Sequence, residues 1–305
     1  MPWHNVLADG KRIVHAMATN VVAGLFPHWY VRLTEQTGRG SEEETPESIA
    51  AYFKQCFADY LRVLEIADTE WGRFLQGKNV IEYGPGDLPA VAILLVAFGA
   101  ESVLCVDRFP LIRLSLLNQR ALDRLIAALD APQRERAQQC FRIAGEYGSG
   151  LNPERIRYVI HPKGLSGQRD WADLLISRAA LEHVNDLDAT LDDMRQAMKP
   201  QGWAVHQIDL KSHGLHRRNP LDFLVWPGWL WKLMYGFKGF PNRLRVDSYR
   251  QILERLKLHI IQLKPDLLAS PADIAAVRPR LCAAFRGVSD ADLSWLEFWL
   301  VFRLS

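Results

Sequence analysis

The chain has 305 residues, with 37 Lys and Arg against 35 Asp and Glu, which gives a formal net charge of +2. This length allows one large α/β domain with an appendage. The near balance of charges argues against a protein built mainly to neutralise nucleic-acid phosphates, and we expect no nucleic-acid partner.

Four cysteines stand apart, with no C-x-x-C pair among them. Their spacing predicts neither a disulfide framework nor a zinc site, so it favours a reducing, cytoplasmic location.

Residues 1–75 predict a helical N-terminal extension. Lys11 and Arg12 precede an apolar run that His15 and Asn20 interrupt. A spanning helix needs about 20 continuous apolar residues, so we expect neither a spanning helix nor a signal peptide here. A polar, turn-rich stretch follows, and Ser48 is placed to cap a helix with a roughly helical apolar stripe.

From residue 79 onward strands and helices alternate. The predicted helices cover 90–98, 111–129, 187–198 and 248–256, and the predicted strands cover 80–83, 102–106, 156–160, 172–177, 203–210, 258–263 and 296–303. This alternation is typical of a doubly wound, Rossmann-like α/β fold with a seven-stranded, mostly parallel sheet. We therefore predict a ligand-binding domain over 76–305, with an aromatic insert over 212–246.

A glycine turn follows the first predicted strand in the stretch NVIEYGPGD, residues 79–87. Gly84 and Gly86 let the backbone approach a ligand closely, and Asp107 ends the next strand, where it can accept hydrogen bonds from ribose hydroxyls. Dinucleotide sites and adenosylmethionine sites share this pattern. Pro89 stands where a dinucleotide site needs a third glycine, and the Glu82 carboxylate suits an ammonium group better than a pyrophosphate. A nicotinamide-dependent oxidoreductase is therefore the less favoured alternative.

Several segments in order carry a family resemblance. IEYGPGD, VLCVDRF and DLLISRAALEHVNDLDATLDDMRQAMKPQGW resemble the class I S-adenosylmethionine-dependent methyltransferases over roughly 79–210. The resemblance implies S-adenosyl-L-methionine as cofactor, bound by Glu82, Gly84, Gly86 and Asp107. By the same resemblance, the cofactor site also includes Tyr83 and Arg108, which neighbour these residues, and Ser177 and Arg178, which match its strand-four position. Leu88 and Gln201 depart from glycines that are frequent in the family, and the segment after the third strand does not match it.

Transfer of a methyl group to a hydroxyl needs alignment of the acceptor and often a base that removes its proton. The fifth strand ends in HQIDLKSH, residues 206–213, which is polar for a buried parallel strand. We take His213 as the first candidate base and Asp209 as its orienting or substrate-binding partner. The alternative is a solvated histidine with a capping aspartate. His183 is a second candidate base, although histidines at this place often only shape the cofactor pocket.

A metal site is a minority interpretation. Methyltransferases of ubiquinone biosynthesis and of small-RNA ends resemble this segment, and there an E-x-x-E-H cluster supplies the ligands. Glu182 and His183 match, but Ala179 replaces the first glutamate. The ligand set is then incomplete unless Asp209, His206 or His213 completes it, and we expect no metal.

The insert over 212–246 is rich in aromatic residues. Three interpretations stay open: a lid over the acceptor, a membrane-interface anchor over 226–240, or core packed on the sheet edge. Its pattern also resembles uncharacterised bacterial methyltransferases suspected of acting on glycans or secondary metabolites. We expect O-methylation of a small-molecule or carbohydrate-like acceptor, with a non-catalytic cofactor-binding subunit as a further alternative. The residues in question are His216, Arg217, Arg218, Trp226, Trp229, Trp231, Tyr235, Phe237 and Phe240.

Overall fold

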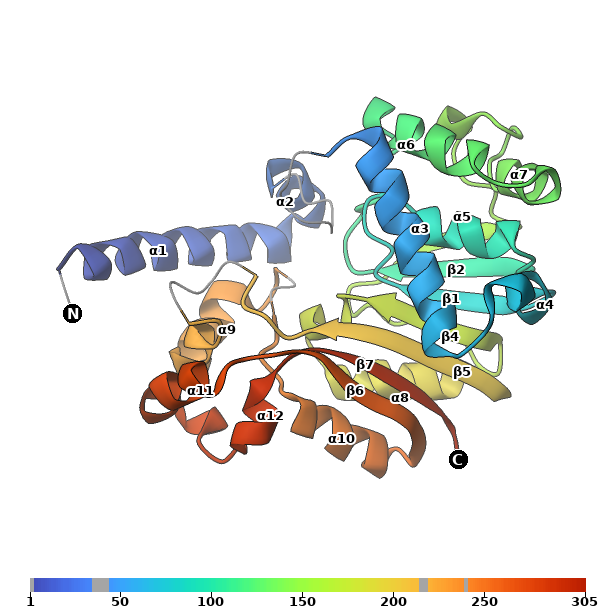
Figure 1. Ribbon diagram of the computed structural model, residues 1–305. Coiled ribbons are helices and arrows are strands. Elements are labelled where there is room, and N and C mark those ends of the chain that lie inside the picture. The colour runs from blue at the N-terminus through green and yellow to red at the C-terminus, as the bar shows by residue number, and fades with distance from the viewer. Residues whose placement is uncertain (1–2, 35–43, 214–218, 239–240) are drawn as a thin grey trace.

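The computed structural model describes residues 3–34, 44–213, 219–238 and 241–305, with side chains from residue 10 onward. Its sheet has seven strands in the order β3-β2-β1-β4-β5-β7-β6 (Figure 1). Strands β1 to β5 pair in parallel, and β7 pairs antiparallel with both β5 and β6. The predicted doubly wound, mostly parallel α/β fold is confirmed. The strands are β1 (Asn79–Tyr83), β2 (Ser102–Asp107), β3 (Ile156–Ile160), β4 (Ala172–Arg178), β5 (Met198–Asp209), β6 (Leu258–Leu268) and β7 (Trp295–Leu304).

Helices cover both faces of this sheet and bury two apolar cores. One core packs α3, α5, α6 and α7 on the sheet, and the other packs α8 and α10 on the opposite face (Figure 1). The α-helices are α1 (Trp3–Leu25), α2 (Pro27–Thr34), α3 (Pro46–Val63), α4 (Trp71–Leu75), α5 (Ala90–Ala97), α6 (Leu116–Ala127), α7 (Ala131–Gln138), α8 (Leu187–Ala197), α9 (Gly228–Tyr235), α10 (Val246–Arg255), α11 (Pro271–Val277) and α12 (Asp290–Ser294).

Helix α3 begins at a capping box in which Thr45, not Ser48, is the N-cap residue. The Ser48 amide donates to the Thr45 hydroxyl, and the Thr45 amide donates to the Ser48 hydroxyl. Two backbone donors are thereby satisfied at the helix start. The apolar stripe of α3 packs into the same core as α5 and α6, so this helix lies directly over the sheet.

Two other predicted boundaries differ from the structure. The helix predicted from residue 111 begins at Leu116, because Ser115 has extended backbone and caps the helix by accepting from the Asn118 amide. The segment 199–202, expected as a turn before a strand, lies within β5. There the register with β4 jumps from the Ala172–Met198 pair to the Leu174–Trp203 pair, so the extra residues bulge out.

The aromatic insert has a helical core. Trp231 and Tyr235 of α9 are buried in a third apolar cluster, whereas Trp229 and Phe237 are exposed. One face of α9 is therefore core, as one of the three interpretations of the insert predicted. His216, Arg217, Arg218 and Phe240 lie outside the described residues.

Candidate functional site

The glycine turn after β1 has a backbone that only glycine adopts easily. Gly84 and Gly86 both have φ of +73°. A Cβ atom at Gly84 would lie 2.7 Å from the Ala180 Cβ, on the loop that follows β4. The turn therefore packs directly against the end of β4, and a side chain at Gly84 would push the two segments apart.

Asp107, at the carboxyl end of β2, has two carboxylate oxygens that differ in their hydrogen bonds. Its Oδ1 accepts from the backbone amides of Arg108 and Phe109, at 2.6 and 3.2 Å. Its buried Oδ2 accepts no hydrogen bond from any residue that the structure describes. Burial raises the Asp107 pKa to about 7, against the pull of those two amides. A buried acceptor without a donor is costly, and hydroxyl groups of a ligand can supply the donors.

Glu82, in the adjacent strand β1, is a second buried carboxylate. Its Oε2 accepts only a long contact from the Cys105 thiol, with 3.7 Å between sulfur and oxygen. Burial, with a smaller contribution from Asp107, raises the Glu82 pKa to about 7. A cationic group placed here would stabilise the charged form of both carboxylates.

Helix α3 supplies a wall of this site that the sequence did not predict. Glu82, Gly84 and Gly86 line one pocket together with Tyr52 and Tyr60 of α3. Arg178 also lines the pocket, where its Nη1 donates to Asp59 Oδ2 at 2.9 Å. The roughly helical apolar stripe was visible in the sequence, but no local signal tells which part of the sheet it covers.

The other cofactor candidates are held by contacts on the far side of their strands or beside the pocket. The Tyr83 hydroxyl donates to Asp193 at 2.8 Å in the opposite core. Ser177 Oγ and His206 Nδ1 lie 2.8 Å apart and are fully buried. Adjacent residues of a strand point to opposite faces, so Tyr83 and Ser177 can reach the pocket through their backbone only.

Arg108 joins three segments around the end of β2. Its Nη1 donates to the His183 carbonyl at 2.9 Å, and longer bonds of 3.4 Å reach the carbonyls of Pro162 and Phe237. The residue therefore links the cofactor side of the site to the loop after β4 and to the end of α9.

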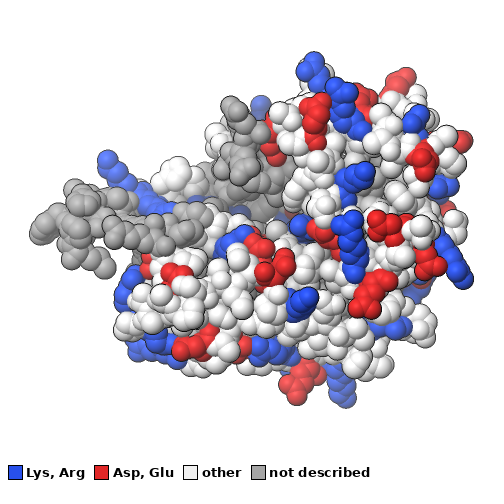
Figure 2. All heavy atoms as spheres, viewed as in Figure 1, with Lys and Arg blue, Asp and Glu red and all other residues white. Residues whose placement is uncertain are grey.

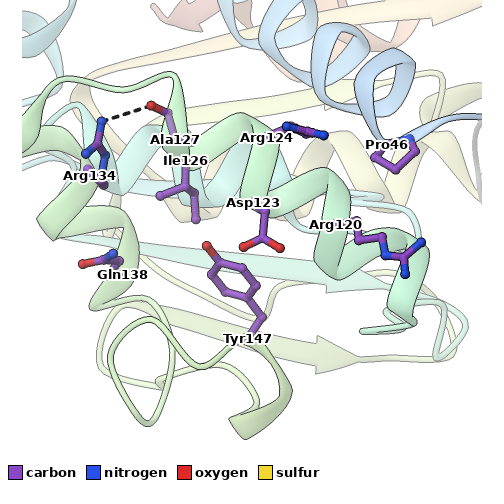
Figure 3. Close-up of a pocket in the computed structure, with 9 residues that line it drawn as sticks. All are labelled: Pro46, Arg120, Asp123, Arg124, Ile126, Ala127, Arg134, Gln138 and Tyr147. Atoms are coloured by element: carbon purple, nitrogen blue, oxygen red, sulfur yellow. Dashed lines mark hydrogen bonds between the residues drawn. The ribbon is translucent and has the colours of Figure 1, made fainter.

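A larger cavity, of about 720 Å³, lies elsewhere, and Figure 3 shows the residues that line it. They come from the start of α3, from α6 and α7 and from Tyr147, and the Arg134 guanidinium among them donates to the Ala127 carbonyl. None of them belongs to the glycine turn or to a strand end. Since ligands of doubly wound sheets bind beyond the carboxyl ends of the strands, we place the functional site at the glycine turn.

Three side chains converge beyond the ends of β4 and β5. Glu182 Oε1 lies 3.7 Å from His183 Nε2 and 4.0 Å from His213 Nε2, and the two imidazole rings are 4.9 Å apart. Glu182 is 1% exposed, whereas the two histidine side chains are each 30% exposed. The cluster therefore has a buried carboxylate and two imidazoles that open to solvent.

The Glu182 carboxylate is held without a well-formed hydrogen bond. Neither of its oxygens has a hydrogen-bond partner among the residues that the structure describes. Burial raises the Glu182 pKa well above its ordinary value, and repulsion from Asp209 adds to this, while nearby backbone amides and Lys211 oppose it. A positive charge on either imidazole, or a bound cation, would stabilise the carboxylate.

Asp209 and His206 are held by other contacts and lie outside the Glu182–His183–His213 cluster. Asp209 Oδ1 accepts from the Lys211 amide and Oδ2 pairs with the Lys211 ammonium at 3.2 Å, so the carboxylate beside His213 is Glu182. His206 is fully buried against Phe302, and burial lowers its pKa to about 3. It is neutral near pH 7 and is absent from the cluster.

The NRLR stretch at 242–245 holds the cluster in place. The Asn242 side-chain amide donates to the carbonyls of Leu181 and Val184, and the Asn242 backbone N–H donates to the Glu182 carbonyl at 2.6 Å. Arg245 is fully buried and donates to the Leu210 carbonyl at the end of β5. The insert and the loop after β4 therefore form one packed unit.

The protein is doubly wound, with two buried carboxylates and a glycine turn at the ends of β1 and β2. A family model described as a methyltransferase domain matches residues 47–263, and the chain belongs to this family. The protein is an S-adenosylmethionine-dependent methyltransferase, and S-adenosylmethionine is its cofactor. This result favours methyl transfer over the nicotinamide alternative. No match is found among curated proteins.

Solved structures that match this chain include an S-adenosylmethionine-dependent methyltransferase from Mesorhizobium loti, at 20% identity and a TM-score of 0.41. That match covers 77% of this chain and 97% of the other. A TehB-like S-adenosylmethionine-dependent methyltransferase from Corynebacterium glutamicum matches at 13% identity and a TM-score of 0.37, over 84% of this chain and 98% of the other. At such identities the likeness is one of fold, and family membership rests on the domain match.

Proposed function

We propose that this enzyme methylates an oxygen of a small-molecule or carbohydrate-like acceptor, and that the Glu182–His183–His213 cluster activates the acceptor hydroxyl. The observation that carries the proposal is the convergence of two imidazoles on one buried carboxylate. Glu182 and His183 lie on the loop after β4, whose Ala180 packs against Gly84, and His213 reaches them from the end of β5. The cluster is therefore next to the turn where the methyl donor is expected.

The cofactor residues fit an adenosine-linked, cationic donor. Asp107 Oδ2 is placed to accept from ribose hydroxyls, and Glu82 to accept from the ammonium group directly or through water. Gly84 and Gly86 allow the backbone to approach the ligand. When bound, the cofactor supplies an electrophilic methyl group on a sulfonium.

The cluster can accept the proton that the acceptor hydroxyl loses. As the acceptor oxygen is methylated, a His213 nitrogen would accept the proton of its hydroxyl group. The imidazolium then has the Glu182 carboxylate 4.0 Å away, and His183 beside it is a second proton acceptor. Charge that forms on His213 offsets the cost of burying Glu182, so the pair stabilises the step in which the proton moves.

A divalent cation is a second candidate occupant of the same cluster. One ligand atom from each of Glu182, His183 and His213 lies within 4.8 Å of the others. A carboxylate with two imidazoles suits Zn²⁺ and other first-row divalent ions. Metal content of the purified protein, measured before and after dialysis against a chelator, separates this candidate from a proton-accepting role.

The test compares His213→Ala with His259→Ala, a control on the β6 strand outside the site. Each variant is given labelled S-adenosylmethionine and a panel of sugars, nucleotide sugars and phenols, and adenosylhomocysteine affinity is measured by calorimetry. We expect His213→Ala to lower turnover at least about 100-fold, the lower range for a lost general base, with cofactor affinity unchanged. Equal turnover in the two variants would contradict the role of the cluster.

A further inference from the structure

Exposed apolar side chains concentrate on α1, α2 and α9. Of eighteen large apolar side chains that are exposed among the described residues, ten belong to these helices and the residue-237 turn. We call this set the apolar platform: Val14, Met17, Val21, Leu25, Phe26, Trp29, Leu33, Trp229, Leu233 and Phe237. A monomeric protein rarely leaves such a patch in water without a partner.

Helical spacing places these side chains in stripes. Val14, Met17, Val21 and Leu25 follow at intervals of three and four on α1, away from the buried stripe of Ala16, Asn20 and Ala23. Trp229, Leu233 and Phe237 are spaced by four. Each stripe therefore faces one direction, outside the core.

Contacts between the two helices join the stripes. The Asn20 side chain donates to the Leu233 carbonyl at 3.0 Å and accepts from the Phe237 amide at 2.8 Å. Gly24 lies against the Phe237 ring, with 3.0 Å from an added Cβ to the ring. Figure 1 shows α1 projecting from the body of the protein and passing over α9. Helices α1 and α9 therefore pack against each other, and Phe237 of the platform contacts α1.

Basic residues predominate on the platform helices, since Asp9 is the one acid in the sequences of α1, α2 and α9. Residues 10–34 and 226–238 contain three Lys and two Arg and no Asp or Glu. Lys11, Arg32 and Lys232 among them are exposed, whereas Lys238 is buried. Basic side chains lie along the projecting helix in Figure 2. No helix that the structure describes is long and apolar enough to cross a membrane.

We propose that the apolar platform binds the surface of an anionic lipid bilayer. Tryptophan and phenylalanine side chains insert at the level of the head groups, and Lys11, Arg32 and Lys232 contact anionic lipids. Aromatic and aliphatic side chains with flanking bases are the chemistry of helices that lie in a membrane interface.

The platform adjoins the catalytic side of the enzyme. Arg108 donates both to the Phe237 carbonyl, at the edge of the platform, and to the His183 carbonyl, in the cluster. A bilayer bound at the platform therefore lies beside the acceptor site. Resting on the proposed function, the acceptor class is then a hydroxyl-bearing head group carried by a lipid.

Flotation with vesicles tests the platform without any turnover. We expect the enzyme to partition onto vesicles of phosphatidylcholine mixed with phosphatidylglycerol, and at least about tenfold less onto phosphatidylcholine alone. The double variant Trp29→Ser/Trp229→Ser should lose about tenfold or more of the partition, and Lys11→Glu/Lys232→Glu should lose the preference for the anionic vesicles.

A matched control removes exposed apolar side chains elsewhere. Leu116→Ser/Leu268→Ser changes two exposed leucines outside the platform and should partition like the wild type. No partition of the wild type, or equal losses in the platform and control variants, would overturn the proposal. So would self-association by light scattering that the Trp variant abolishes without any vesicle binding, because the occupant would then be a second copy.

The acceptor class has its own readout. Membrane lipid extracts are incubated with enzyme and tritiated S-adenosylmethionine, and organic and aqueous phases are counted. Label in the organic phase that falls in Trp29→Ser/Trp229→Ser supports a lipid-carried acceptor, and label only in the aqueous phase overturns it. Adenosylhomocysteine binding, measured on the same preparations, shows separately whether the cofactor site works, so the two failures are distinguishable.

Discussion

Asp107→Asn is the sharpest test of the cofactor site, because the two oxygens of Asp107 have different partners. The amide oxygen of asparagine can replace Oδ1 and keep the bonds from the Arg108 and Phe109 amides. The amide nitrogen then takes the place of Oδ2, which has no partner among the described residues. A nitrogen there donates and cannot accept from a ribose hydroxyl.

The size of the effect follows from the kind of bond that is lost. A hydrogen bond to a charged group contributes about 1.5–3 kcal/mol, so one lost ribose contact weakens adenosylhomocysteine binding by roughly 10- to 100-fold. The protein without ligand should not lose stability in this variant. Burial raises the Asp107 pKa to about 7, so above that pH the variant removes a buried charge whose Oδ2 has no donor among the described residues.

Calorimetric titration with adenosylhomocysteine and thermal melting without ligand give the two readouts. Asp173→Asn is the control, because Asp173 binds the Asn79 amide and the Lys199 ammonium at the opposite end of the strands. The control should lower the melting temperature and leave adenosylhomocysteine affinity unchanged. Wild-type affinity in a folded Asp107→Asn protein would refute the assignment of Oδ2 to the ribose.

Three further predictions address the same site. Adenosylhomocysteine affinity should rise from about pH 6 to about pH 8, by about tenfold for each carboxylate that must ionise, because the pKa values of Glu82 and Asp107 are both raised to about 7. The free energy of unfolding of the ligand-free protein should change with pH in the opposite direction. A carboxylate whose pKa is raised in the folded state stabilises the protein at low pH, and this contribution is lost as pH rises through about 7. Melting of wild type against Asp107→Asn measures the part that Asp107 contributes. Gly84→Ala should lower the free energy of unfolding, measured in urea, by about 1–3 kcal/mol and weaken adenosylhomocysteine binding. The reason is that φ of Gly84 is +73° and that Ala180 blocks the new Cβ. Wild-type affinity would contradict the packing of this turn. Asn242→Ala should lower turnover and reduce stability by about 1–3 kcal/mol, because it leaves the Leu181 and Val184 carbonyls without their donor; calorimetry should show unchanged cofactor affinity, and unchanged turnover would contradict the positioning role.

The sequence predicted those features that depend on local pattern. Apolar runs ending in Glu82-Tyr83-Gly84 and in Asp107 marked the carboxyl ends of two parallel strands, and alternation with helices predicted the sheet that the structure confirms. These signals are contained in a few consecutive residues, so one chain is enough to identify them.

Contacts between distant segments were not visible in the sequence. The wall that Tyr52 and Tyr60 form over Glu82 depends on where α3 crosses the sheet, and the apolar stripe of a helix does not specify that place. Likewise, the sequence showed the polar end of the fifth strand. It could not show that the chain turns after β5 so that His213 reaches Glu182. The arginines of the NRLR stretch are buried and donate to carbonyls, and no local pattern in the sequence predicts these contacts.

The electrostatics of the strand ends explain why these separate signals belong to one function. A buried acid away from the strand ends is fully bonded: Asp193 of α8 accepts from the Tyr83 hydroxyl and from the amides of Ser166 and Gly167. At the ends of β1, β2 and β4, in contrast, Glu82, Asp107 and Glu182 are buried with too few donors, and each has a raised pKa. Burying acceptors in this way opposes folding, so the arrangement is stable mainly when donors and positive charge arrive from outside. On the proposed assignment, a sulfonium cofactor with an ammonium group and ribose hydroxyls would bring both to Glu82 and Asp107, and a proton or cation would bring charge to Glu182.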